Sequence, residues 1–128
     1  MDLASFQLAP DAAEVARKWL QSLASEKRLA LKSREAYGRD LSQFAAFLQE
    51  HAEALADKAA LAKLTIADFR AFLASRKGGG ISSRSIARQV SALRSFFRFA
   101  ERNGHFVNPA YVSLRSPKLP HAIPRPLP

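Results

Sequence analysis

Cysteine is absent from this sequence of 128 residues, and tryptophan and methionine occur once each. Without thiols the chain can form neither a disulfide nor a thiolate metal site. No apolar run approaches the ~20 residues that a helix needs to span a bilayer. The first residues also lack the basic segment followed by an apolar segment that marks a signal peptide. We therefore expect an unprocessed, cytoplasmic protein with no membrane partner.

Acidic residues are scarce in the second half of the chain. Residues 1–75 contain ten Lys/Arg and ten Asp/Glu, whereas residues 76–128 contain ten basic residues and one acidic residue. The formal net charge of +9 therefore arises in the second half. Such an excess attracts phosphate backbones and gives a salt-sensitive affinity that does not depend on base sequence.

Patterns that indicate catalysis or metal binding are missing as well. The three histidines, His51, His105 and His121, lie far apart, and none has metal-ligand spacing with a carboxylate. The glycines at 78–80 follow no predicted strand and precede no Lys-Ser/Thr pair, so they do not form a P-loop. Tyr111 is not part of a catalytic histidine-arginine constellation, and Tyr37 lies on the apolar face of its predicted helix. We expect no catalytic residue, no metal and no cofactor in this chain.

One strongly patterned stretch runs from Ser82 to Gly104. Apolar residues recur on one face at helical spacing, Ser82 or Ser83 can cap the start, and Gly104 is a suitable left-handed stop. The opposite face carries Arg84, Arg88, Ser91, Ser95, Arg98 and Arg102. Only Glu101 offsets these charges at helical spacing. We interpret this face as an array for a polyanion and expect Arg84 and Arg88 to be free of internal ion pairs; a solvated polar face is the alternative.

Three further amphipathic segments predict helices at residues 10–25, 33–51 and 65–76. In the first, Trp19 lies on the apolar face and is predicted to fill the core. Thr65 is placed to cap the third, with Asp68 at the capping-box position. Residues 52–64 are rich in alanine and fit either a short helix or an irregular crossing. The connection at residues 76–81 is longer than the turn of a helix-turn-helix motif, which we therefore do not favour.

The last twenty residues differ from the rest in composition. They contain six of the seven prolines, which remove backbone donors and favour extended geometry. We predict a helical domain of residues 1–108, followed at 109–128 by a Pro-rich extended C-terminal linker that leads toward a second domain. An ordinary disordered tail is the alternative.

Five segments together resemble the N-terminal core-binding (SAM-like) domain of tyrosine recombinases of the Xer group. They are Ser33 with AYGRDLSQFAAFL (36–48), IADFRAFLASR (66–76), ISSRSIARQVSALRSFFRF (81–99), Asn108-Pro109-Ala110, and SPKLPHAIPRPL (116–127). They cover most of the chain. Ala30 and Leu31 stand where the family often has Ser-Pro, a departure at the start of the second helix. The resemblance implies an all-α fold, a four-helix orthogonal bundle.

The resemblance also implies a whole enzyme that clamps duplex DNA between this domain and a C-terminal catalytic domain. Family catalysis uses a tyrosine nucleophile with arginine, lysine and histidine residues of that second domain. This chain is then expected to bind a double-stranded recombination site without cutting it, in the nucleoid, as part of a recombinase of the chromosome dimer resolution type. The implied partner is a XerD-like recombinase subunit on DNA, and a monomer is expected off DNA.

In the family, the second and fourth helices face the major groove. The positions that match those helices in this sequence are Lys32, Ser33, Glu35 and Arg39 in the second helix and Arg84, Ser85 and Arg88 at the start of the fourth. The full set of DNA-binding candidates is Lys32, Ser33, Arg39, Lys77, Ser83, Arg84, Ser85, Arg88, Arg98 and Arg102. Arg88 is our candidate for a bidentate bond to guanine O6/N7, and Arg84, Arg98 and Arg102 are candidates for phosphate contacts. The alternative function is a helical protein-interaction module whose basic face meets an acidic partner.

Overall fold

The computed structural model of the chain describes residues 6–116, which form an all-α fold. The helices are α1 (Pro10–Ser25), α2 (Leu31–Ala52), α3 (Lys58–Ala62), α4 (Ile66–Gly78), α5 (Ser83–Arg102) and the 3-10 helix η2 (Tyr111–Ser113). Within the described range, the one β-type pairing is an isolated bridge between Leu8 and Ala56. The predicted all-α class is confirmed, with short α3 added to the four long helices.

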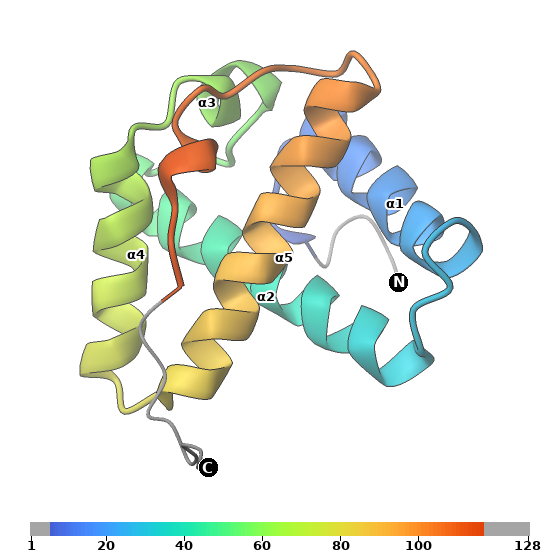
Figure 1. Cartoon of the computed structure of the whole chain (residues 1–128). Helices are drawn as coiled ribbons and strands as arrows, with labels where there is room; N and C mark the ends of the chain where they lie inside the picture. Colours follow the sequence, from blue (N-terminus) through green and yellow to red (C-terminus); the bar gives the residue numbers. More distant parts are fainter. Residues whose placement is uncertain (1–5, 117–128) are drawn as a thin grey trace, which may run out of the picture.

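Helix α5 lies at the centre of the molecule (Figure 1). It crosses in front of α2, with α1 on one side and α4 on the other, and it contacts all three. Its apolar face buries Phe97 completely. The ring of Phe97 lies 5.3 to 6.4 Å, centroid to centroid, from five other aromatic rings, those of Phe44, Phe69, Phe96, Phe106 and Tyr111. Most of these pairs meet edge to face, the arrangement that the ring quadrupole favours.

The predicted helix ends agree closely with the structure. Ser82 caps α5, since its Oγ accepts from the Ser85 backbone N–H at 3.1 Å. Gly104 follows the last turn with a φ of 74°, in the left-handed region. Thr65 and Asp68 form the predicted capping box of α4.

Helix α2 begins two residues earlier than the predicted position 33. Ala30 is its N-cap and makes no side-chain capping bond. The Arg34 backbone N–H donates to the Ala30 carbonyl at 3.0 Å as the first bond of the helix, and Arg34 Nε donates to the Leu29 carbonyl at 3.1 Å. The first turn is therefore held by an arginine that reaches back along the chain, a contact that residue propensity does not indicate.

The undecided region 52–64 contains both of the alternatives, an irregular crossing followed by the short helix α3. Asp57 caps α3 by accepting from the Ala60 backbone N–H at 2.8 Å. Leu61 is fully buried and anchors the segment to the core. No helix among residues 6–116 is long and apolar enough to cross a membrane.

The packed unit continues past residue 108, where we expected a linker to begin. Asn108 is fully buried, donates from Nδ2 to the Leu61 and Leu64 carbonyls at 2.8 and 3.0 Å, and accepts at Oδ1 from the Ala110 and Tyr111 backbone N–H groups. This side chain fastens the two segments together.

Tyr111 and Leu114 are then 5% and 2% exposed. Arg94 of α5 completes the attachment, because its Nη1 donates to the Tyr111, Val112 and Leu114 carbonyls at 2.8 to 3.3 Å. The expectation that the chain leaves the domain at residue 109 is therefore wrong for 109–116, since burial of two apolar side chains holds this stretch on the core. The rest of the predicted linker, 117–128, lies outside the described residues.

Candidate nucleic-acid interface

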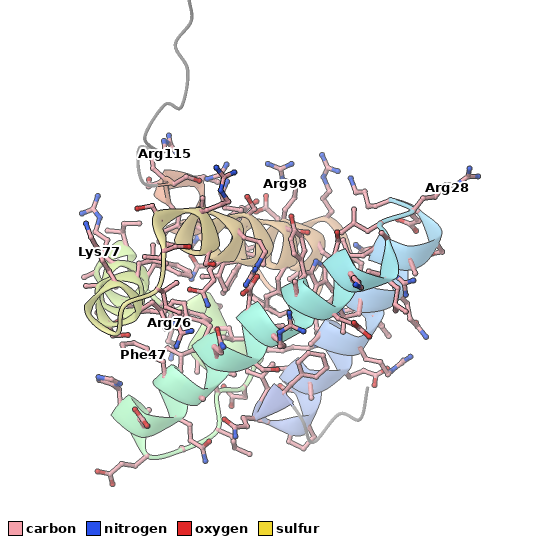
Figure 2. All side chains as sticks on the ribbon, turned by 90° about the horizontal axis from the view of Figure 1, so that it is seen from below. Arg28, Phe47, Arg76, Lys77, Arg98 and Arg115 are labelled. Atoms are coloured by element: carbon pink, nitrogen blue, oxygen red, sulfur yellow. The ribbon has the colours of Figure 1, made fainter. Side chains whose placement is uncertain are left out.

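The end of the molecule where α2 and α5 begin and α4 ends carries most of the predicted DNA-binding residues. Figure 2 looks onto this end, with α2 across the front, α5 above it and Lys77 of α4 at the edge. Ser83 and Ser85 are half-buried in the first turn of α5. The exposed candidates are Lys32, Ser33, Arg39, Lys77, Arg84, Arg88, Arg98 and Arg102. Three elements of the fold therefore contribute cations or hydroxyl groups to one end.

Three of the candidates share a surface hollow beside the α2–α5 crossing. Its volume is about 350 Å³, and it is lined by Leu29, Lys32, Ser33, Ala36, Tyr37 and Arg88. Leucine, alanine and tyrosine supply an apolar lining, while the lysine, serine and arginine can donate hydrogen bonds. The hollow thus combines a hydrophobic wall with groups that can donate hydrogen bonds.

Arg88 was predicted to be free of internal ion pairs, but it forms one inside the protein. Its Nε and Nη2 donate to Asp40 Oδ2 and Oδ1, both at 2.8 Å. The Asp40 side chain is fully buried, whereas that of Arg88 is 41% exposed. The Asp40 hydrogen bond raises the pKa of Arg88, although partial burial acts the other way. The prediction that Arg88 is free is therefore wrong, since a carboxylate on the inner face of α2 requires a cation.

The remaining cations of this end are not neutralised in that way. The ion pairs among the described residues are Arg17 with Glu14 and Arg88 with Asp40. Arg84, Lys32 and Lys77 belong to neither, as expected for Arg84. The positive field at this end therefore comes from the unpaired residues of α2, α4 and α5, while Arg88 contributes donors at a fixed position more than net charge.

Arg98 and Arg102 lie farther along α5 and away from the first hollow. Arg98 projects to the far side of α5 from α2 (Figure 2). Both arginines line a second hollow of about 360 Å³ between α1 and α5, together with Lys27 and Trp19. The ten candidates therefore fall into two groups. Eight lie at the end where α2 and α5 begin and α4 ends, and the phosphate candidates Arg98 and Arg102 lie farther along α5.

Several polar contacts between helices were not predicted from the sequence. Besides Asp40, Gln89 Nε2 donates to Gln43 Oε1 at 2.6 Å, which links α5 to α2. Trp19 is buried as predicted, but its Nε1 donates to Ser95 Oγ at 2.9 Å, so this serine is no solvated residue. A signal was present, because Asp40 and Gln89 interrupt the apolar stripes of α2 and α5. A polar residue in a buried stripe indicates a partner across the helix pair.

The two tyrosines have structural contacts. Tyr37 stacks on Trp19 with ring centroids 6.2 Å apart, and the Tyr111 hydroxyl donates to Glu101 at 3.3 Å. Between residues 6 and 116, no three or more His, Cys, Asp or Glu side chains gather in a way that could hold a metal ion.

Comparison with known proteins identifies relatives of this chain. Tyrosine recombinase XerC of Methylobacterium nodulans is 47% identical over 120 residues, which are 94% of this chain and 37% of the relative. XerC of Rhizobium meliloti is 41% identical over 118 residues (92% and 37%), and XerC of Rhodospirillum centenum is 38% identical over 122 residues (95% and 36%).

The chain thus spans little more than a third of the length of these curated relatives, about 37%. No solved structure matches it. Residues 16–104 match the family described as phage integrase, N-terminal SAM-like domain. This match covers most of the five-helix unit, and the relatives confirm the resemblance to the Xer group and to XerC. The chain belongs to the family of phage integrase N-terminal SAM-like domains.

Proposed function

We propose that this chain is the DNA-binding domain of a XerC-type site-specific tyrosine recombinase, and that the end formed by α2, α4 and α5 binds in the major groove of duplex DNA. Relatives 38 to 47% identical carry the name tyrosine recombinase XerC, which supports the recombinase class. In the proposal, a catalytic domain completes the clamp around DNA, so this chain alone does not cut. A XerD-like subunit is the partner on DNA, and chromosome dimer resolution is the process.

The observation that carries the proposal is the set of unpaired cations at one end of the bundle. Lys32 and Arg39 on α2, Lys77 on α4 and Arg84 on α5 are exposed and belong to neither ion pair of the described residues. Unpaired like charges repel one another unless an anion neutralises them. A phosphate backbone supplies such anions at regular spacing.

Different candidates take different roles in this proposal. Arg84, Arg98 and Arg102 bind phosphates, and Ser83 and Ser85 add hydroxyl donors near the start of α5. Arg88 and the hollow beside it contact bases. Because Arg98 and Arg102 flank the second hollow along α5, they follow the DNA backbone away from the base-reading end.

A salt titration tests the proposal. Affinity for a fluorescent duplex is measured at several salt concentrations for the unmodified chain, for Arg84→Ala, and for the control Lys63→Ala. Lys63 is exposed next to α3, at the opposite end of the molecule (Figure 1). The affinity should fall as salt rises, and Arg84→Ala should reduce the slope of log K against log salt by about 1. Lys63→Ala should leave the slope unchanged.

An affinity that does not change with salt would contradict the proposal. Tight capture of an acidic protein by the same arginine face, with no affinity for duplex DNA, would favour the protein-interaction module instead.

A further inference from the structure

We propose that Asp40 is a positioning residue for base recognition: it holds Arg88 so that the free edge of the guanidinium faces the hollow beside α2 and binds a guanine there. This inference rests on the proposed DNA-binding function and extends it to a second residue. Asp40 itself is fully buried and does not reach DNA. Asp40 affects base specificity only by holding the Arg88 guanidinium in position.

The hydrogen bonds to Asp40 leave the correct donors available. An arginine has five N–H donors arranged as a planar fork. Nε and Nη2 each donate one hydrogen to a carboxylate oxygen of Asp40. Both hydrogens of Nη1 and the second hydrogen of Nη2 remain, and they lie on the end of the fork away from Asp40. Two parallel donors of this kind match guanine O6 and N7 in the major groove.

Unequal exposure across the pair indicates a role beyond holding the helices together. Asp40 is fully buried, whereas 41% of the Arg88 side chain remains open to solvent. The carboxylate therefore fixes a cation that still has an accessible surface. A long side chain that is already ordered loses less conformational freedom on binding, so discrimination between bases improves.

The hollow next to Arg88 gives the base edge a place to lie. Arg88 lines it together with Lys32 and Ser33, which can contact the adjoining backbone, and Ala36 supplies apolar surface. An apolar methyl group of this kind also suits the methyl of a neighbouring thymine. The second hollow carries Arg98 and Arg102 but has no comparable buried carboxylate holding either arginine among the described residues.

Selection from random duplexes provides the test, since it requires no known site. The complete chain is used to select its preferred sequence, and the affinity for that duplex is compared with the affinity for a scrambled one. Asp40→Asn keeps the side-chain shape but removes the charge that pairs both donors. We expect this variant to lower the preference ratio about tenfold, while affinity for scrambled DNA stays the same or rises slightly. Glu50→Gln, an exposed charge change on the same helix, is the control and should leave the ratio unchanged.

Arg88→Lys is the second variant, because a lysine keeps the charge opposite Asp40 and protects the fold while losing the fork. It should lose the preference to the same degree, and combining it with Asp40→Asn should add no further loss. Thermal melts establish that each variant is folded.

A preference retained in Arg88→Lys would overturn the inference. The inference would also be overturned if folded Asp40→Asn kept the preference for the selected duplex while its melting temperature fell. The ion pair of Arg88 and Asp40 would then be purely structural. Failure of the underlying function looks different: the unmodified chain itself would then show no salt-dependent affinity for DNA.

Discussion

At the scale of single residues, the ion pair of Arg88 separates two arginines that look alike in the sequence. Arg84 and Arg88 lie one turn apart on the same polar face of α5. Periodicity could place both away from the core, but it could not show that α2 presents a carboxylate to one of them. Asp40 belongs to a different helix, 48 positions away. The interaction is therefore a consequence of the crossing of α2 and α5, which the sequence pattern alone does not define.

This difference predicts unequal effects on stability. Arg88→Ala leaves the Asp40 carboxylate buried without a partner, which costs about 3 kcal/mol, at the lower end of the usual range because water can reach the site of the lost side chain. Arg84→Ala removes an exposed residue with no ion pair and should change the free energy of unfolding by less than about 0.5 kcal/mol. Urea unfolding followed by circular dichroism measures both. If Arg88→Ala changed the free energy of unfolding as little as Arg84→Ala does, the buried Asp40 carboxylate would need no cation.

At the scale of elements, the sequence predicted the helices that have strong periodicity and recognisable caps. α1 begins and ends where predicted, and the caps at Ser82 and Thr65 are confirmed. Less was predictable where a distant contact decides the conformation. The fold of 52–64 depends on the burial of Leu61, and the path of 109–116 depends on Asn108 and Arg94. Local propensity carries no information on such contacts.

The candidate interface was predictable to the same extent. The sequence indicated which residues are exposed and basic, because an amphipathic helix divides its faces by period. It did not indicate that Lys32, Ser33 and Arg88 share one hollow while Arg98 and Arg102 line another. That division depends on where α1 and α2 meet α5.

The turn between α4 and α5 gives a matched pair of glycine substitutions with opposite signs. An added Cβ meets nothing within 4 Å at either Gly78 or Gly80, but Gly80 has a φ of 91°. Gly78→Ala, in the last turn of α4, should stabilise the protein by about 0.5–1 kcal/mol, because alanine has less freedom to lose on folding. Gly80→Ala should cost about 1–2 kcal/mol, since an L side chain strains a left-handed residue. Thermal melts of the two variants should shift in opposite directions; shifts of the same sign would contradict the conformation of the turn.

At the scale of the whole molecule, the packed unit includes residues beyond the predicted boundary at 108. Tyr111 stacks on Phe97 at 6.1 Å, so the segment closes the aromatic cluster at the centre of the core. The sequence suggested a boundary there because prolines begin at that point. Proline composition, however, reports backbone geometry and does not report whether the side chains between prolines are buried.

Leu114 and Val112 test this extension. Leu114 is 2% exposed and Val112 is 51% exposed. Leu114→Ala should cost about 2–4 kcal/mol in the free energy of unfolding, because it removes buried methyl groups and leaves a cavity. Val112→Ala should change it by less than about 0.5 kcal/mol. Denaturant titration provides the comparison, and a neutral Leu114→Ala would show that residues 109–116 are no part of the packed unit.

The chain has a single tryptophan, and the structure places it in a seam between three helices. Trp19 of α1 rests against Tyr37 of α2 and donates to Ser95 of α5. Its fluorescence therefore reports on this seam without any added label or mutation. Ultraviolet emission can follow in real time whether the bundle stays closed when its basic end meets a polyanion.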